Sequence, residues 1–325
     1  MAFHALMIVR DEADVIPETL AHLCTWADEI VILDTGSVDG TREIIDQWQR
    51  DESRIRVLEH DPIFYSNAAR KIIFDAARSR MRRGDWFVRA DADEFYPVSP
   101  PEFVARWCRG CDGQVFKHAF DSTLTEAEFE RWRSDPASSP LEAASVRERG
   151  LKFAENDYLE PRMNRYRPSM RWHAGEFAPR RGGVPCERRL TIEHFRYRHP
   201  MQLARRLLLR RLNYEHHASH GRRVASLYEK TRLSEVLVDT KETELVDRET
   251  VAIRAADPLP IRTHRLSRIG RYRAGARIYP VVASVLDRME RSTRTAAPEP
   301  ISDAVQTRIR DAYRDIERNG LNHLI

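Results

Sequence analysis

The chain has 325 residues, 42% of them hydrophobic and 32% charged, which indicates a globular protein with one elaborated α/β domain, or one domain and a smaller appendage. Its 54 basic and 50 acidic residues leave a net charge of +4, which by itself does not argue for a polyanionic partner. The 4 cysteines do not make a disulfide framework in a chain this long, so a reducing intracellular compartment is expected.

The first third of the chain alternates short apolar runs with amphipathic stretches. Strands are predicted at 5–9, 29–34 and 54–58, within 84–96, and later at 114–120. Helices are predicted from Pro17, from Thr41, over 67–80 and, after the last of these strands, over 125–133. Strands that alternate with helices at this spacing predict a parallel sheet with right-handed crossovers, whose ligands bind beyond the carboxyl ends of the strands.

Residues 84–96 contain three carboxylates within four positions, which needs a physical reason in a buried strand. Successive side chains of an extended chain point to opposite sides, so Asp91 and Asp93 point the same way and Ala92 leaves space between them. Two carboxylates on one side of a strand end are suitable ligands for Mg²⁺ or Mn²⁺. The alternative is a solvated acidic turn without a function.

Two more acidic residues follow earlier strands, Glu12 after the first and Asp34 at the end of the second. Because the carboxyl ends of parallel strands share one edge of a sheet, one crevice would hold these acids together with Asp91 and Asp93. Taken singly, Asp34 is as well explained by an Asx turn and Glu12 by an acid that precedes a helix. Three acidic strand ends in order favour a binding crevice.

Three segments, 7–12, 26–41 and 90–95, together carry a family resemblance. In order and spacing they resemble the family 2 glycosyltransferases of the GT-A fold. The resemblance implies an α/β fold with a Rossmann-like, mostly parallel sheet flanked by helices, which is followed here by a helical C-terminal extension. It also implies transfer of a sugar from a nucleotide diphosphate sugar to an acceptor hydroxyl, with inversion at the anomeric carbon.

The resemblance further implies which residues hold the donor nucleotide. Arg10 and Glu12, in the loop after the first strand, would contact the nucleoside together with Asp34. Arg70 resembles the basic residue that the family has before the acidic strand, and could add a charge-assisted contact to the donor. A surface arginine is the equally weighted alternative for Arg70.

The acidic motif and a later histidine form the implied metal end of the site. Asp91 and Ala92 would contact the donor nucleotide, while Asp93, Asp91 and His194 would hold Mn²⁺ or Mg²⁺. A divalent cation there stabilises the diphosphate leaving group as a Lewis acid. Glu94 either contacts the donor sugar or supports the other acids. A lone histidine is more often a satisfied core or surface residue, which is the alternative for His194.

Residues 162–166 and 171–176 resemble a further family pattern, an arginine-rich strand followed by a turn with a His and a Glu. An inverting transfer needs a general base that takes the proton of the acceptor hydroxyl. Glu176 is the first choice for this base, with Asp157 and Glu155 in reserve. A salt-bridged surface acid among neighbouring arginines is the alternative for Glu176.

The C-terminal third is rich in arginine. A helix with arginines beside an apolar stripe is predicted over 201–220, and a second arginine cluster covers 262–277. Such a face could hold the diphosphate, an anionic membrane, a lipid-phosphate acceptor or a nucleic acid. Acidic residues between the clusters favour a solvated surface instead. A linker over 291–301 precedes a last helix over 303–318, which would dock back or form a homodimer contact.

The sequence therefore predicts a metal-dependent glycosyltransferase with a catalytic domain at 1–200, a basic helical extension at 201–290, and a linker and final helix at 291–325. The alternatives are a nucleotidyltransferase on a related sheet, which would normally carry a glycine-rich phosphate loop after the first strand, and a non-catalytic binding protein for an anionic partner. The acceptor stays open among a saccharide, a lipid carrier, a protein and a modified nucleic acid.

No signal peptide pattern is visible, and no segment approaches the ~20 apolar residues that span a bilayer. We therefore expect a soluble, cytoplasmic protein, with peripheral attachment at the inner face of the membrane as an alternative. Cys108 and Cys111 have the CxxC spacing of metal and redox sites. Because no second CxxC follows, a buried or loop pair without a function is favoured.

Overall fold

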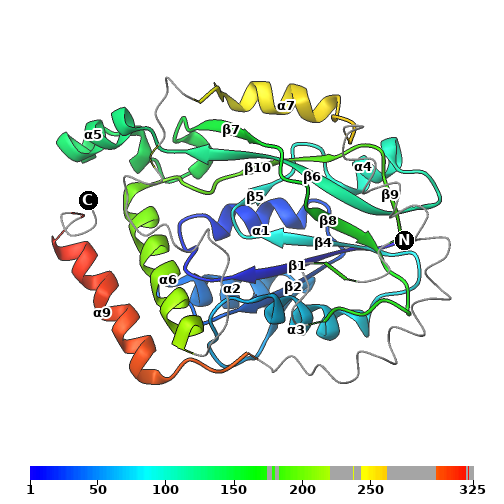
Figure 1. Cartoon of the computed structure of the whole chain (residues 1–325), viewed down its shortest axis with the longest axis horizontal. Helices are drawn as coiled ribbons and strands as arrows, with labels where there is room; N and C mark the ends of the chain where they lie inside the picture. Colours follow the sequence, from blue (N-terminus) through cyan, green and yellow to red (C-terminus); the bar gives the residue numbers. More distant parts are fainter. Residues whose placement is uncertain are drawn as a thin grey trace.

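The computed structural model describes residues 1–173, 178–179, 183–219, 237, 243–261, 298–319 and 321. Within them, one 11-stranded sheet forms the centre of the fold (Figure 1). Its strands are β1 (Phe3–Val9), β2 (Glu29–Asp34), β3 (Ile55–Leu58), β4 (Trp86–Asp91), β5 (Glu94–Phe95), β6 (Asp112–Thr123), β7 (Lys152–Asn156), β8 (Pro161–Arg165), β9 (Val184–Pro185), β10 (Leu190–His194) and β11 (Leu245–Val246). The α-helices are α1 (Ile16–Cys24), α2 (Thr41–Asp51), α3 (Asn67–Arg78), α4 (Pro100–Trp107), α5 (Glu126–Ser134), α6 (Pro200–Ser219), α7 (Arg248–Ala256) and α9 (Asp303–Asn319).

Four parallel strands form the first half of the sheet, in the order β3-β2-β1-β4. A helix joins each strand to the next along the chain, as parallel pairing requires. The register places Val9 beside Asp34 and Ile8 beside Asp91, so β1, β2 and β4 end at one edge. The strands, helices and parallel order predicted for the first third of the chain are confirmed.

The second half of the sheet is mixed. β8 runs antiparallel to both β4 and β6, β7 runs antiparallel to β6, and β10 runs parallel to β6. The α/β class is confirmed, but fewer strand pairs are parallel than the sequence suggested, because β8 can pair with β4 without a crossover helix. This antiparallel return brings the first residues of β8 to the region where β4 ends.

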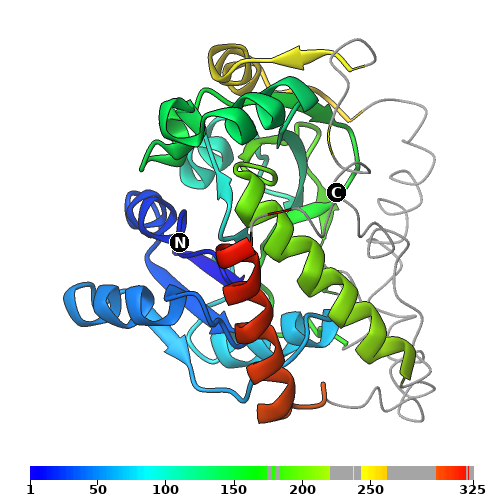
Figure 2. The same ribbon diagram turned by 90° about the vertical axis from the view of Figure 1, so that its left-hand side faces the viewer.

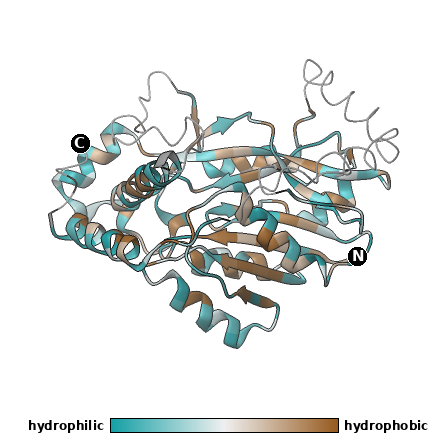
Figure 3. Ribbon diagram, turned by 60° about the horizontal axis from the view of Figure 1, so that its bottom comes forward, coloured by the Kyte–Doolittle hydropathy of each residue, from teal (hydrophilic) through white to brown (hydrophobic). Residues whose placement is uncertain are grey.

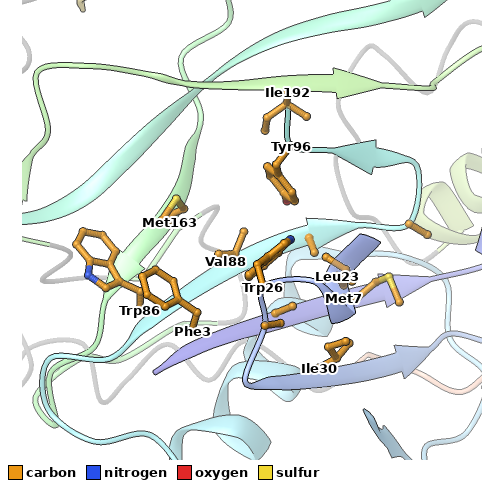
Figure 4. Close-up of a cluster of buried hydrophobic side chains, with 14 of the residues drawn as sticks. Phe3, Met7, Leu23, Trp26, Ile30, Trp86, Val88, Tyr96, Met163 and Ile192 are labelled. Carbon is orange, nitrogen blue, oxygen red and sulfur yellow. The ribbon is translucent and has the colours of Figure 1, made fainter. Parts of the chain in front are cut away.

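Side chains of β1 alternate between the two faces of the sheet, and each face carries its own core. Met7 packs with Leu23 of α1 in one core, which Figure 4 shows in close-up. Leu6 belongs to a second core, with Phe74 of α3. Figure 3 shows the resulting distribution, with apolar strands inside and polar residues on the outer parts of the helices. The parallel strands are therefore covered on both faces.

Helices α6 and α9 lie side by side at the end of the sheet to which β1 and β4 point (Figures 1 and 2). Leu212 of α6 and Ile309 and Tyr313 of α9 share an apolar cluster with Phe64, and the Arg205 guanidinium lies 5.4 Å from the centre of the Tyr313 ring. The helices predicted over 201–220 and 303–318 are thus confirmed, and α9 docks back onto its own chain.

Several sequence predictions lie outside the described residues. They are Glu176 and the second arginine cluster, at 262–277. Among the helices that the structure does describe, none combines the length and the apolar character that crossing a membrane requires.

The turn after β2 gives a direct test of how α9 docks. Gly36 has φ +107, and a Cβ there would lie 2.5 Å from Gln306 Nε2 of α9 and 2.7 Å from Pro62 Cβ. We expect Gly36→Ala to lower the free energy of unfolding by about 1–3 kcal/mol, because it adds a clash to a backbone conformation that favours glycine. Urea unfolding measures this loss.

A second substitution separates the two contributions. Gln306→Ala removes the flexible part of the clash, so the double variant should recover part of the stability that Gly36→Ala loses, beyond the additive value. Strict additivity of the two changes would contradict the contact between this turn and α9. Gly40→Ala is the matched control, since Gly40 also has positive φ but has no atom within 4 Å of its virtual Cβ.

Candidate functional site

The carboxyl ends of β1, β2 and β4 carry the polar residues singled out by the sequence. The loop 10–14 follows β1, Asp34 ends β2 and Asp91 ends β4. Ala92 and Asp93 form the turn from β4 into β5, and both are buried. The strand register brings these residues to one edge of the sheet, as predicted from the parallel order.

Asp34 and Arg10 shape the loops at this edge. The Oδ1 atom of Asp34 accepts hydrogen bonds from the backbone N–H of Gly36 (3.1 Å) and from the N–H and hydroxyl of Ser37 (3.0 and 2.7 Å). Arg10 donates to the backbone oxygen of Thr35 at 2.9 Å. The Asx-turn interpretation of Asp34 is therefore confirmed, and a contact of its carboxylate with a nucleoside stays a prediction.

Arg162, the second residue of β8, holds the two ends of the acidic motif. Its Nη1 lies 3.1 Å from Asp91 Oδ2, and its Nη2 lies 2.5 Å from Glu94 Oε1. Burial raises the pKa of Glu94 to about 7, against the opposing charge of Arg162. The Glu94 side chain is 0% exposed, whereas that of Asp91 is 44% exposed. Asp91 can thus meet a ligand directly, while Glu94 lies inside the protein.

Glu160, which lies near Arg162, pairs with further basic side chains. Its carboxylate accepts from Arg89 Nη2 at 2.5 Å and from Lys117 Nζ at 2.8 Å. Arg70 and Arg162 each approach it to 3.8 Å. The surface interpretation of Arg70 is wrong, because its side chain is 11% exposed and faces this buried acid. Contact of Arg70 with a donor diphosphate stays a prediction.

Asp93 and His194 meet, as predicted. The His194 Nε2 atom lies 3.3 Å from Asp93 Oδ1, and its Nδ1 lies 2.7 Å from Asp121 Oδ1. Arg206 of α6 donates to the other Asp93 oxygen at 2.9 Å. Burial alone would lower the pKa of His194, but the carboxylates of Asp93 and Asp121 outweigh it and raise the pKa to about 10. The imidazole is therefore protonated in this arrangement at neutral pH.

Arg198 holds the loop after β1. This fully buried guanidinium donates to both oxygens of Asp14, at 2.9 and 2.5 Å, and makes a short contact with Glu12. Burial raises the pKa of Glu12 to about 7, because the charge of Arg198 offsets only part of the desolvation. Glu12 is thus an acid whose protonation state can change near neutral pH.

A pocket of about 460 Å³ opens between this loop and the helices α6 and α9. Glu12 and Arg206 line it, and Arg206 also contacts Asp93, so the pocket borders the predicted metal end of the site. Its remaining lining residues are Arg10, Asp11, Ala13, Asp14, Asp39, Leu141, Glu142, Arg149, His199, Met201, Gln202, Arg205, Leu209 and Tyr313.

Two of the three predicted general bases, Asp157 and Glu155, lie within the described residues, and each pairs with a basic side chain. Asp157 accepts a hydrogen bond from Arg189 at 2.5 Å, and the preceding Asn156 bonds Asp121, the partner of His194, at 2.9 Å. Asp157 is therefore linked to His194 through its neighbour Asn156 and through Asp121. Glu155 pairs with His118 at 2.7 Å. Glu176 lies outside the described residues, so its role stays a prediction.

Four residues of this site carry roles that the sequence did not assign: Glu160, Arg162, Arg198 and Arg206. The alternation of arginines in β8 and after β10 was a signal for the second and third of them. Arg206 was expected on a solvated face, and that interpretation is wrong, since it contacts buried Asp93. Nothing local marks Glu160 as the partner of four basic side chains.

Replacing Arg198 tests how strongly the buried acids depend on it. Arg198→Met should lower the free energy of unfolding by about 3–5 kcal/mol, because Glu12 and Asp14 both lose contact with its fully buried guanidinium. Urea unfolding at neutral pH measures the loss. The matched control Arg254→Met, on the exposed side of α7, should change stability by less than about 0.5 kcal/mol. A loss near the control value would contradict the assigned role.

The pH dependence of stability tests the same contact from the acid side. Burial would raise the pKa of Asp14, but Arg198 and Arg149 outweigh it and lower the pKa to about 2, from 3.8. A lowered carboxyl pKa stabilises the fold above the ordinary pKa and loses that contribution as the pH falls toward 2. The advantage of wild type over Asp14→Asn should therefore shrink below pH 3.8 in urea unfolding. A constant difference would contradict it.

Parts of the chain are similar to known proteins. Residues 5–161 match the model of Glycosyl transferase family 2. A TPR repeat-containing protein of Synechococcus elongatus is 40% identical over 88 residues, which are 27% of this chain and 19% of that protein. This chain therefore matches less than a fifth of that curated relative's length.

Two solved structures are also similar. TarS of S. aureus, in complex with UDP, has 14% identity and a TM-score of 0.27 over 38% of this chain and 36% of its own. Mannosyltransferase PcManGT from Pyrobaculum calidifontis, in complex with GDP-Man and Mn²⁺, has 13% identity and a TM-score of 0.35 over 98% and 88%. The family model gives the assignment: residues 5–161 of this chain belong to glycosyl transferase family 2.

Proposed function

We propose that this protein is a glycosyltransferase that moves a sugar from a nucleotide diphosphate sugar to an acceptor hydroxyl. The family match carries the proposal, because it covers β1 to β4 and the acidic residues at their carboxyl ends. Glu12, Asp34 and Asp91 lie at the edge where open α/β sheets bind their ligands.

The donor would lie along this edge. In the proposal Arg10, Glu12 and Asp34 contact the nucleoside, while Asp91 and the backbone at Ala92 contact the rest of the nucleotide. The 44% exposure of the Asp91 side chain supports this role. The complete burial of Glu94 argues for support of Asp91 through Arg162, rather than for direct contact with the sugar.

The residues around Asp93 fit a divalent cation, Mn²⁺ or Mg²⁺. His194 is oriented by a carboxylate on its Nδ1 atom and presents Nε2 toward Asp93, an arrangement common for metal-binding histidines. Asp93 and His194 would hold the cation, with Asp91 as a further ligand, and it would stabilise the negative charge of the diphosphate leaving group. His194 would have to release a proton, and Arg206 would have to move from Asp93.

An inverting transfer needs a carboxylate that accepts the proton of the acceptor hydroxyl. We assign this base to Glu176, with Asp157 as the alternative. The position of Asp157 next to Asn156, which bonds the partner of His194, supports the alternative. The acceptor in this proposal is a saccharide, a lipid carrier, a protein or a modified nucleic acid.

A binding screen with Asp93→Asn tests the metal end of the site. Wild type should show thermal shifts with at least one nucleotide diphosphate sugar, larger when Mn²⁺ or Mg²⁺ is present. Asp93→Asn should weaken the metal-dependent binding about tenfold or more, because it removes a ligand charge. Asp257→Asn is the matched control, since that carboxylate is 92% exposed at the end of α7.

Two outcomes would count against this assignment. Unchanged metal-dependent binding by Asp93→Asn would move the metal to other residues. A wild-type protein that binds no nucleotide sugar in either metal, and releases no nucleoside diphosphate from one, would overturn the glycosyltransferase proposal.

A further inference from the structure

A thiol and carboxylate cluster lies outside the donor site. Cys108 caps the C-terminus of α4, Asp112 begins β6 and Cys186 follows β9. The two sulfur atoms and a carboxylate oxygen of Asp112 all lie within 4.8 Å of one another. Asp112 is 4% exposed and Cys186 is 0% exposed. Three potential metal ligands therefore converge in a largely buried place.

The sheet brings these residues together from distant parts of the chain. β9 pairs with the start of β6, Asp112 opposite Val184, and the N–H of Cys186 donates to the Gln114 oxygen at 2.7 Å. On the other side, the Asp112 carboxylate accepts from the N–H of Arg109 at 2.8 Å, which closes the turn between α4 and β6. These contacts hold the Asp112 carboxylate and the backbone at Cys186 in place without a metal.

We propose that Cys108, Asp112 and Cys186 form a zinc-binding site, with Cys111 as the fourth ligand. Zn²⁺ prefers four tetrahedral ligands, and thiolates and carboxylates are both among them. Cys111 is exposed, and its Sγ lies 3.8 Å from Asp112 Oδ1, which makes it the candidate for the fourth ligand. The thiols lose their protons to solvent when the ion binds, so binding strengthens as the pH rises.

A disulfide between Cys108 and Cys186 is the competing chemistry. Zinc uses the Asp112 carboxylate, an oxygen of which lies within 4.8 Å of both sulfur atoms, as a third ligand, whereas a disulfide gives this buried acid no part. Zinc also gives a role to the CxxC spacing of Cys108 and Cys111. Asp112 and Cys186 supply the two further ligands that a second CxxC would provide.

The site lies away from the donor edge. In Figure 1, α4 and β9 lie on the right, whereas β1 and β4 point left toward α6 and α9. Bound zinc would tie the end of α4 to β6 and to the segment after β9, which continues into β10 and His194. This role is structural, and it does not depend on the proposed transfer reaction.

Metal analysis of the reduced, full chain tests the proposal. Wild type purified without chelator should carry about one zinc ion per chain. After chelation it should bind Co²⁺ with the absorption bands of tetrahedral thiolate coordination. Cys186→Ser should lose the zinc and these bands, while the control Cys24→Ser, at the end of α1, should keep both. Far-UV circular dichroism verifies that each variant is folded.

The outcomes separate zinc from its competitors. Failure of the reduced, folded wild type to bind Zn²⁺ or Co²⁺ would overturn the proposal, as would zinc binding that Cys186→Ser leaves unchanged. A Cys108–Cys186 cross-link in peptides of protein purified under reducing conditions would also overturn it. Cys111→Ser should weaken zinc affinity at least about tenfold. Unchanged affinity in that variant would refute Cys111 as the fourth ligand.

Discussion

Carboxylates that gather at the ends of parallel strands repel one another, and burial strengthens that repulsion because the surroundings screen charge poorly. This protein buries Asp93, Glu94 and Glu160 at or beside one edge of its sheet. Such a group is compatible with a stable fold only if cations are buried with it. The guanidinium groups of Arg162 and Arg198, each 0% exposed, meet this requirement.

The second half of the sheet and the elements after it supply these buried cations. β8 returns antiparallel beside β4 and so places Arg162 against Asp91 and Glu94. The segment after β10 supplies Arg198, and α6 supplies Arg206. The parallel half and the turn after β4 provide Asp91, Asp93 and Glu94, and the later elements provide the cations that pair with them. Both halves of the sheet are therefore needed to form this edge with its charges paired.

Local sequence patterns were sufficient to predict much of this architecture. Apolar runs, helix periodicity and the order of strand ends placed Asp34, Asp91 and Asp93 at one edge, and the acids were expected to share it. The buried ion pairs could not be found in this way, because the residues that form them are far apart in sequence. Arg198 and Asp14 are separated by 184 positions, and no local periodicity relates them. The same is true of Cys186, which completes a cluster that the CxxC spacing alone left incomplete.

The contacts of α9 have a consequence for how the protein is made. Tyr313 donates a hydrogen bond to Asp11 at 2.8 Å across 302 positions, and Gln306 contacts Arg10 across 296. During synthesis, the strands of the parallel half can pair long before α9 leaves the ribosome. The pocket beside Glu12 gains its outer wall only when that helix arrives. A nascent chain would therefore leave this pocket open on one side until α9 has been synthesised.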